Sequence, residues 1–422
     1  MDALPESFDN EKAQTSPPQS PALAARALDP RQKEKFDAIR LACRDHDVVA
    51  LTELALSDEG LMSDNVRKEA WPILLGASRS REQCDAENEK KSSWKKLPPH
   101  PDENQVKLDV DRSFIYYPTD VTPRELGERK DELYDLIVEV LRRHPMLGYF
   151  QGFHDICQVF LLVLGPERSV TAIEHIALLR IRDFMLPTMG PALDHLQLLF
   201  PLLQAVDPKL CAHISLTQPF FALAATLTLY AHDITEYSDI ARLFDAFIAL
   251  DQVFPLYLFA QIVIERRDEL LSIPDDEPEM LHVTLSKLPK PLDLDGLISR
   301  AIELQKQHPP HRLSTWRRVS RYSVLKATPI LRNSSSKPSP AEDLAKAEIL
   351  FRKHCEEMER TKRRQEMLQA LQKRRKPLIV TLTVFIAVVS VGLELYNRKH
   401  HGASMSRSVM LGVGGLWRIL KG

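Results

Sequence analysis

Amphipathic helical periodicity runs through most of the chain and constrains its fold more than any other feature. From about Arg31 to Gln307, apolar residues recur with the spacing of one helix face, and short polar or proline-containing turns separate the segments. Examples are LYDLIVEVLRRH, HLQLLFPLLQAV and IARLFDAFIAL. The period-two alternation typical of strands is scarce. We therefore predict an all-α domain.

The composition excludes several classes of protein. The 422 residues include 56 Lys and Arg against 58 Asp and Glu, a formal net charge of −2 at pH 7, which excludes a nucleic-acid binder that works by bulk positive charge. Only 14 glycines occur, and GxGxxG is absent, so a doubly wound nucleotide-binding fold is not expected. The five cysteines are scattered without a CxxC pair, which argues against a disulfide framework and a zinc site and suits a reducing compartment.

Changes in composition divide the chain into six parts. Residues 1–34 are proline-rich, lack the apolar region of a signal peptide, and are predicted to be a disordered leader. The expected order is then a helical domain over 35–307, a linker rich in proline, serine and basic residues over 308–341, a charged helix that becomes basic over 342–376, a membrane anchor over 377–396 and a short tail over 397–422.

The proposed anchor contains an uncharged run of sixteen residues, Leu378–Leu393. Extended to Pro377 and Tyr396, the segment spans about 30 Å as a helix, which is enough to cross a bilayer. A buried core helix is the alternative, but no sequence able to form a surrounding domain follows, and basic residues flank both ends. The expectation is a tail-anchored protein, with a hairpin in the membrane as the second option, since the basic residues on the two sides are too even to decide.

The first of three local patterns lies near the start of the helical domain. It reads Arg67-Lys-Glu-Ala-Trp71-Pro-Ile-Leu-Leu-Gly76. Taken alone, this is an amphipathic helix end in which Trp71 packs into the core and Gly76 stops the helix. Both residues are predicted to be structural.

The second and third patterns contain the polar residues of interest. The second pairs Asp109 with Arg112, which by itself is typical of a solvated ion pair. The third is Tyr149-Phe-Gln151-Gly-Phe-His-Asp155-Ile, which enters a very apolar run. On a helix, Tyr149, Phe153 and Ile156 would share one face. Read alone, this pattern is better explained by a partly buried helix with satisfied polar groups.

Together and in this order, the three patterns resemble the TBC-domain family of Rab GTPase-activating proteins. The resemblance continues at Arg242-Leu-Phe-Asp245 and covers roughly residues 60–290. It implies a helical Rab-GAP domain that assists GTP hydrolysis on a partner rather than an enzyme with its own substrate pocket. The Mg²⁺ and the nucleotide would belong to the Rab, so no cofactor of this chain is expected.

The resemblance also implies roles for individual residues. Arg112 would be an arginine finger that neutralises charge on the transferring phosphoryl group, and Gln151 would orient the attacking water in place of the glutamine of the Rab. Asp109, Tyr149, Gly152 and Asp155 would support them: Asp109 would hold the Arg112 loop, and Asp155 would fix the helix end at Gln151. Structural roles are expected for Arg67, Trp71, Gly76, Arg242 and Asp245.

The membrane segment refines the expected function and leaves two alternatives. Membrane-anchored members of the family imply a location in the endoplasmic reticulum membrane, a catalytic domain that faces the cytosol, and a Rab partner of early secretory, ER-to-Golgi transport. One alternative is a catalytically idle, membrane-tethered scaffold that only binds a Rab, although such members lack the Arg or the Gln. The other is a helical lipid-handling or membrane-shaping protein, which would remodel bilayers without affecting GTP turnover.

Overall fold

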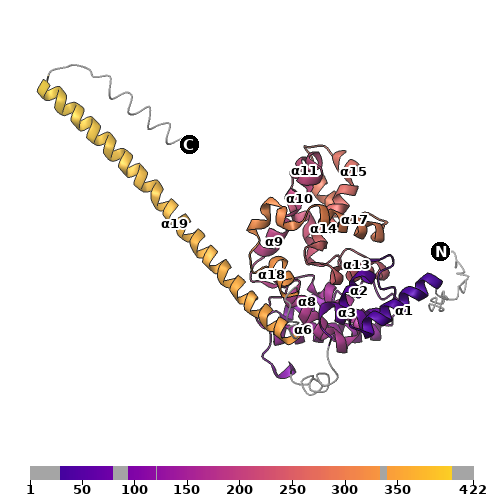
Figure 1. Ribbon diagram of the computed structural model, residues 1–422. Helices are drawn as coiled ribbons and strands as arrows, with labels where there is room; N and C mark the ends of the chain where they lie inside the picture. The colour runs from indigo at the N-terminus through magenta and orange to yellow at the C-terminus, as the bar shows by residue number, and fades with distance from the viewer. Residues whose placement is uncertain (1–28, 79–93, 120, 333–339, 402–422) are drawn as a thin grey trace, which may run out of the picture. The chain divides into compact units, whose positions relative to one another are not determined.

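Helices account for all the regular secondary structure in the part of the chain that the computed structural model describes, which is residues 29–78, 94–119, 121–332 and 340–401 (Figure 1). The all-α prediction is confirmed for these residues. The predicted leader, apart from its last six residues, and most of the predicted tail lie outside them. Contacts within the chain separate two units, Met1–His354 and Cys355–Gly422.

The first unit is built from short and medium helices. In its N-terminal part the helices are α1 Pro30–Arg44, α2 Val48–Leu56, α3 Asp64–Leu75, the 3₁₀ helix η1 Trp94–Lys96, α5 Glu103–Val110, α6 Pro123–Arg143, α7 Phe153–Leu164, α8 Pro166–Leu179 and η2 Arg182–Met185. The next helices are α9 Gly190–Leu196, α10 Leu199–Val206, α11 Pro208–Ile214, η3 Pro219–Ala222, α12 Leu223–Leu227, α13 Tyr237–Ala249, α14 Phe254–Glu265, α15 Arg267–Leu271, α16 Pro278–Leu285 and α17 Leu294–Gln307. The remaining elements are η4 Pro310–Arg312, η5 Ser314–Arg318, α18 Val324–Arg332 and α19 Pro340–His401.

Local sequence signals set several of these helix ends. The carboxylate of Asp29 accepts a hydrogen bond from the backbone of Gln32, whose side chain accepts one in return, so α1 begins with a capping box. The pair Thr122 and Glu125 does the same for α6. At the other end of a helix, Gly76 adopts a left-handed φ of 71° and ends α3, as the sequence predicted.

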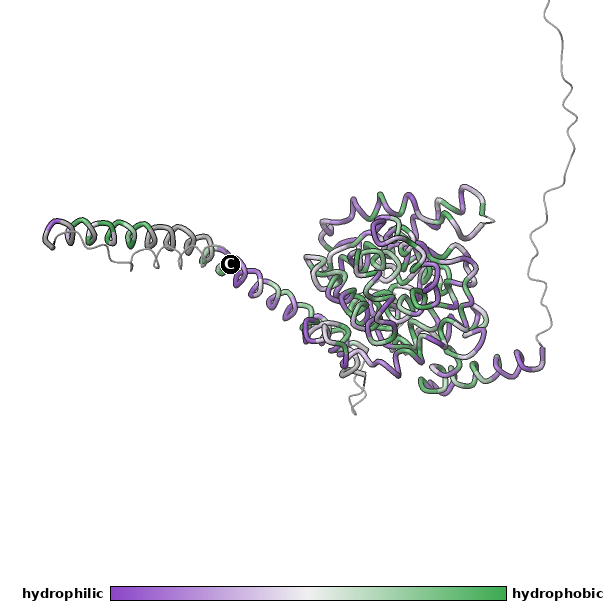
Figure 2. The backbone as a smooth tube through the Cα atoms, turned by 90° about the horizontal axis from the view of Figure 1, so that it is seen from above, coloured by the Kyte–Doolittle hydropathy of each residue, from purple (hydrophilic) through white to green (hydrophobic). Residues whose placement is uncertain are grey.

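Three aromatic side chains from different helices form the centre of the core. Trp71 of α3 lies edge-on to Phe160 of α7, with ring centroids 5.3 Å apart, and Phe244 of α13 packs against both. Trp71 and Phe160 are completely buried. Hydrophobic residues are concentrated inside this part of the chain in Figure 2. Burying such large apolar surfaces joins helices far apart in sequence.

A buried carboxylate connects the first sequence pattern to the last. Asp245, which is fully buried, accepts hydrogen bonds from the guanidinium of Arg67, from the indole of Trp71 at 2.8 Å and from the backbone amide of Leu61 at 2.9 Å. Arg242, one turn earlier on α13, donates instead to Asp295 and to two backbone carbonyls near the end of α2. Four of the five residues assigned to structure from the sequence therefore lie in these two networks, and the fifth, Gly76, ends α3 and belongs to neither.

Residues 308–332 differ from the linker expected over 308–341. They form η4, η5 and α18, and the side chains of Leu313, Val319 and Val324 are buried. The fully buried carboxylate of Asp183 also accepts a hydrogen bond from the amide of Val324. Prolines and serines that suggested a linker lie within or beside these short helices: Pro310 begins η4, Ser314 begins η5 and Pro329 lies in α18. The scattered apolar residues pack on the domain. The first unit therefore extends beyond Gln307.

Helix α19 runs continuously over 62 residues, where the sequence suggested a linker end, a charged helix, an anchor and a tail. Its start belongs to the first unit, with Ala347, Phe351 and His354 buried. Hydropathy changes along the helix, and residues 384–393 are mostly apolar and exposed (Figure 2). The side chains of residues 372–383, which include part of the expected anchor, lie outside the described set.

Among the described residues, no single helix is both long enough and apolar enough to cross a membrane. One bent pair, Pro208–Ile214 with Pro219–Leu227 at 99°, meets the length and composition criteria together. Leu210, Ile214 and Phe221 of this pair are buried within the first unit. The transmembrane part of the fold prediction therefore stays a prediction.

Candidate functional site

An open groove of about 670 Å³ brings the second and third sequence patterns together. Its lining comes from segments 109–117, 150–158 and 220–232, with Met189 at one side. Arg112 and Gln151 both line it. Arg112 and Gln151, which the resemblance singled out, therefore lie at the same groove, although 38 residues lie between them in the sequence.

Arg112 lies in the turn that follows α5. Backbone hydrogen bonds from Arg112 to Asp109 and from Ser113 to Val110 continue the last helical turn and fix this position. The guanidinium folds back on the helix end: Nη2 donates to Asp109 at 2.7 Å and Nε to the carbonyl of Leu108 at 3.2 Å. The side chain is still 65% exposed, and its Nη1 has no hydrogen-bond partner among the described residues. A planar fork with free donors on an open groove is suited to an anionic ligand.

Gln151 lies in the turn that precedes α7. Its side chain is exposed and makes no hydrogen bond to any described residue, so both its amide donor and its carbonyl acceptor are available. The next residue, Gly152, has φ of 106°, and a Cβ placed on it would lie 2.5 Å from Cγ2 of Thr228. Only glycine permits this close approach between the Gln151 turn and the segment after α12.

Asp109 joins the arginine segment to the glutamine segment. Its carboxylate, which is only 1% exposed, holds Arg112 through one oxygen and accepts a 2.9 Å hydrogen bond from the Tyr149 hydroxyl through the other. The backbone amide of Tyr149 in turn donates to Asp102 at the start of α5. Burial and the nearby Asp109 carboxylate raise the pKa of Tyr149, so the hydroxyl stays protonated and remains a donor.

Two histidines that line the groove each contact the carboxylate of Asp155. Nε2 of His154 lies 3.3 Å from one oxygen of Asp155, and Nδ1 of His232 lies 3.2 Å from the other. Burial lowers the pKa of His154 despite the nearby carboxylates, whereas the hydrogen bond to Asp155 raises the pKa of the more exposed His232. Asp155 thus connects α7 to the segment after α12 through side chains. No described contact links its carboxylate to the backbone of the Gln151 turn.

One polar residue of the site escaped the sequence analysis. Oε1 of Gln158, on α7, accepts a 2.9 Å hydrogen bond from the backbone amide of Phe114, two residues after Arg112. Gln158 is only 5% exposed, and it lines the groove. The available signal was an amide side chain in the apolar run FHDICQVFLLVL, seven residues after Gln151.

Exposed apolar side chains also line the groove. Ile115 is 75% exposed, and Tyr116, Phe220 and Met189 are between 37% and 49% exposed. They come from three separate segments of the chain. Large apolar residues gathered around a polar depression are typical of a surface that binds another protein.

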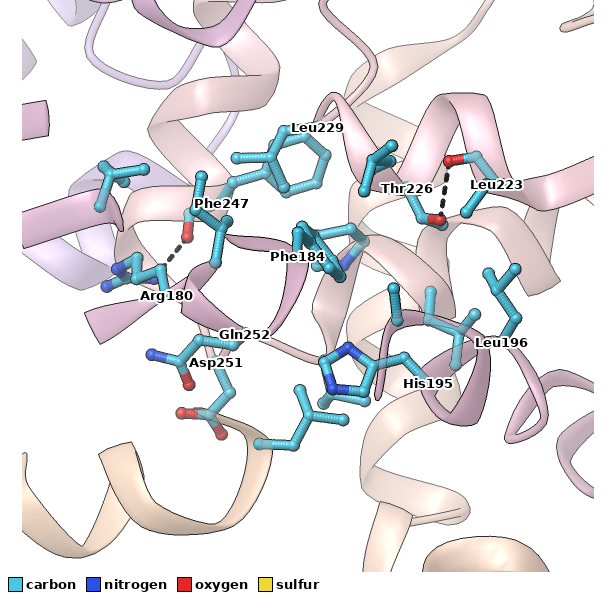
Figure 3. A pocket seen from close by; sticks show the side chains of 18 of the residues that line it. Arg180, Phe184, His195, Leu196, Leu223, Thr226, Leu229, Phe247, Asp251 and Gln252 are labelled. Atoms are coloured by element: carbon cyan, nitrogen blue, oxygen red, sulfur yellow. Dashed lines mark hydrogen bonds between the residues drawn. The ribbon is translucent and has the colours of Figure 1, made fainter. Parts of the chain in front are cut away.

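A second, more enclosed pocket lies behind α12 and shares Leu223 and Leu227 with the groove. In Figure 3, Arg180 reaches the carbonyl of Phe247, at 2.7 Å, and the lining is otherwise mainly apolar. Its volume of about 40 Å³ is enough for a few water molecules but not for a nucleotide. The groove, and not this pocket, is therefore the candidate site.

The described residues contain no group of three or more His, Cys, Asp or Glu side chains arranged to hold a metal ion. Arg112 offers free hydrogen-bond donors at the groove, and Gln151 offers both an amide donor and a carbonyl acceptor.

Comparisons with known proteins agree with the resemblance. A family model, the Rab-GTPase-TBC domain, matches residues 64–271, a range that includes Arg112, Gln151 and Asp245. The GTPase-activating protein gyp10 of Schizosaccharomyces pombe is 33% identical over 302 residues, which cover 70% of this chain and 79% of that protein. The human TBC1 domain family member 20 is 34% identical over 289 residues, which cover 67% of this chain and 70% of that protein.

The fold comparison is consistent with these relatives. The crystal structure of the Ypt/Rab-GAP domain of Gyp1p matches with a TM-score of 0.55 and 14% sequence identity, covering 65% of this chain and 99% of that chain. At this identity the match shows a shared fold. The relatives at 33–34% identity show the family as well as the fold, because the aligned residues cover more than two thirds of each relative. The chain belongs to the Rab-GTPase-TBC domain family.

Proposed function

We propose that this chain is a GTPase-activating protein that accelerates GTP hydrolysis on a Rab by supplying Arg112 and Gln151 to the reaction. The observation that carries the proposal is that both side chains line one groove with free hydrogen-bonding groups. The chain acts in trans: the nucleotide and its Mg²⁺ belong to the Rab, and this protein contributes side chains to the transition state.

Arg112 neutralises charge on the phosphoryl oxygens. A guanidinium stays protonated at physiological pH and presents several donors in a plane, so it stabilises the transition state without a proton transfer. In other GTPases an arginine supplied in trans is worth about 10³–10⁵ in rate. In the free protein Asp109 holds the guanidinium at the groove, and an incoming phosphate competes for the donors that Arg112 has free.

Gln151 orients the attacking water. Its amide carbonyl accepts a hydrogen bond from the water and its NH₂ group donates to a neighbouring oxygen, which aligns the lone pair of the water with phosphorus. The tight turn at Gly152 presents this side chain to the groove. Supplied in this way, the glutamine replaces the one that the Rab itself carries.

The rival function, a catalytically idle scaffold that binds a Rab, is disfavoured by the state of the two side chains. A scaffold needs the apolar residues at the groove, such as Ile115 and Phe220, but it needs neither an exposed arginine nor a glutamine without partners. The assay that separates the two functions is single-turnover GTP hydrolysis on a panel of purified, GTP-loaded Rabs with the full chain. If the chain is an activator, GTP hydrolysis is faster on at least one Rab. If it binds a Rab without accelerating hydrolysis, it is a scaffold.

We further propose that the chain acts at the endoplasmic reticulum on a Rab of ER-to-Golgi transport. Residues 377–396 anchor it, and the catalytic unit faces the cytosol. The uncharged run Leu378–Leu393 is about 24 Å long as a helix, which suits the ER bilayer core of about 27 Å better than the plasma membrane at about 32–33 Å. The basic run Lys373–Lys376 lies next to anionic headgroups on the cytosolic side. A single pass is preferred, and a hairpin is the lesser option.

Deletion of residues 377–422 tests the anchor. The truncated protein is expected to move to the soluble fraction of a carbonate extraction and to keep its activity on a soluble Rab, since Arg112 and Gln151 lie in the first unit. Full retention of the truncated protein in the membrane pellet would show that the anchor lies elsewhere.

In the Rab panel, the Rabs of ER-to-Golgi transport are expected to respond most. A preference for endosomal Rabs alone would contradict that assignment.

A further inference from the structure

Gln158 lies in a position where an apolar residue would be expected. It belongs to the buried face of α7, between Cys157 and Val159, which are both fully buried. Among the described residues, the side chain of Gln158 makes one hydrogen bond, which it accepts from the backbone amide of Phe114 at 2.9 Å. An amide side chain costs free energy in such an environment unless it is paired, so the contact with the segment after Arg112 accounts for its presence.

Phe114 needs an acceptor at this place. Its backbone has φ of 61°, a left-handed conformation that is strained for an aromatic residue, and its side chain is only 7% exposed. The surrounding structure must hold such a conformation, and a buried amide without an acceptor is destabilising. Gln158 supplies the acceptor and so maintains the sharp turn directly after Arg112.

The turn that carries Arg112 is held at both of its ends by the segment that carries Gln151. At one end, Asp109 accepts the hydrogen bond from Tyr149, two residues before Gln151. At the other, Phe114 donates to Gln158, seven residues after Gln151. These two contacts tie residues that flank Arg112 to residues that flank Gln151, the first between two side chains and the second between the backbone amide of Phe114 and the side chain of Gln158.

We propose that Gln158 is a positioning residue for the reaction: through the backbone of Phe114 it fixes Arg112 relative to Gln151. The inference rests on the proposed function. Gln158 does not touch the phosphate itself. Its effect reaches the reaction through the placement of the arginine, and displacements of about 1 Å in a catalytic group reduce rates by up to about 100-fold.

The expected signature is a loss of kcat with little change in KM. Replacement of Gln158 by Met keeps a similar volume but removes the acceptor, and stimulated hydrolysis is expected to fall about 10- to 100-fold. KM for the GTP-bound Rab is expected to change less than about threefold. The groove residues of segment 220–232 do not depend on this bond, and Tyr117, which is buried against Tyr237, still holds the chain beyond Tyr116.

The experiment compares variants of the full chain on the most responsive Rab of the panel, with kcat and KM measured separately. Gln158→Met removes the acceptor, Gln158→Asn shortens the side chain by one methylene, and Gln158→Glu keeps an acceptor in either protonation state. Gln261→Met is the matched control, because Gln261 is also a buried amide but lies on α14 and bonds to Glu265. Thermal unfolding is recorded for each variant.

The inference expects a loss of kcat for Gln158→Met, a smaller loss for Gln158→Asn, and recovery to within about threefold of the wild type for Gln158→Glu. If Gln158→Met does not fold, the comparison of Asn with Glu carries the test. A wild-type kcat for both Gln158→Met and Gln158→Asn, or an equal loss in Gln261→Met, would overturn it. Arg112→Ala in the same assay separates the two claims: full activity of that variant contradicts the proposed function, whereas its inactivity beside a normal Gln158→Asn contradicts only the role of Gln158.

Discussion

The hydroxyl of Tyr149 donates a 2.9 Å hydrogen bond to the buried carboxylate of Asp109. This contact joins two segments whose importance was recognised separately in the sequence, and the same carboxylate holds Arg112 at 2.7 Å. The groove is therefore organised before any partner binds. Such preorganisation reduces the cost of placing catalytic groups when the partner binds.

Arg112 is expected to be indispensable for stimulated hydrolysis. Arg112→Ala and Arg112→Lys are each predicted to lower the single-turnover rate by about 1,000-fold or more, because lysine keeps a charge but lacks the planar fork of donors. The unfolding temperature is expected to stay close to that of the wild type, since the side chain is 65% exposed.

Arg124→Ala is the control for Arg112. It removes an arginine of similar or greater exposure that pairs with Glu128 on the surface of α6, so a wild-type rate is expected. Rates near wild type for both Arg112 variants would remove this residue from the mechanism.

Asp245 is predicted to be the most sensitive carboxylate for stability. Asp245→Asn removes the buried carboxylate that pairs with the guanidinium of Arg67, which then keeps only the part-buried Asp64 as a charged partner, and it weakens the bond from Trp71. The expected cost is about 3–5 kcal/mol in the free energy of unfolding. Urea denaturation at pH 7 measures this change. Asp268→Asn, at a side chain that is 97% exposed, is the control. Equal urea midpoints for the two variants would show that the Asp245 network does not stabilise the domain.

The start of α19 is predicted to bind the domain more firmly at low pH. Burial alone lowers the pKa of His144, but Glu174 and Glu348 outweigh it, so the pKa of His144 is raised above 6.5. A group with a raised pKa contributes its full stabilisation below the unfolded value of about 6.5 and loses it as pH rises through the folded value. The 3.0 Å contact between His144 and Glu348 should therefore weaken between pH 6 and pH 9.

Hydrogen exchange over residues 341–354 measures this effect, after correction for the intrinsic rate at each pH. Protection is expected to be greater at pH 6 than at pH 9, and Glu348→Gln should reduce the difference. Other charged groups also affect this region: Arg143 pairs with Glu139 and Glu174 beside His144, and Asp183 faces His354 on the same stretch of α19. The test is therefore how much Glu348→Gln reduces the difference in protection between pH 6 and pH 9. An unchanged pH difference in that variant would refute the prediction.

Much of the fold followed from the sequence, because its helices are set by local signals. Periodicity predicted an all-α chain, and Gly76 ends its helix through a conformation that glycine adopts readily. The resemblance marked Asp245, and the structure places it beside Trp71. The contacts among Arg67, Trp71 and Asp245 agree with their shared membership of the family pattern.

Other features depend on tertiary contacts that no local pattern contains. The buried residues Leu313 and Val324 follow no helical period within a proline- and serine-containing stretch, so composition alone suggested a linker. Gln158 appeared as one polar residue in an apolar helix, and its role depends on the left-handed conformation of Phe114, 44 residues earlier. These interactions become visible only when distant segments are placed side by side.

The central claim is that this chain supplies the water-orienting glutamine as well as the arginine. The most direct measurement is single-turnover GTP hydrolysis on a responsive Rab whose own switch glutamine has been replaced, with the wild-type chain and with Gln151→Ala. The account predicts that the wild-type chain still accelerates hydrolysis on the altered Rab and that Gln151→Ala loses most of its activity on both forms of the Rab. An altered Rab that no longer responds, together with an active Gln151→Ala on the unaltered Rab, would show that the glutamine of the Rab performs this step and would contradict the account.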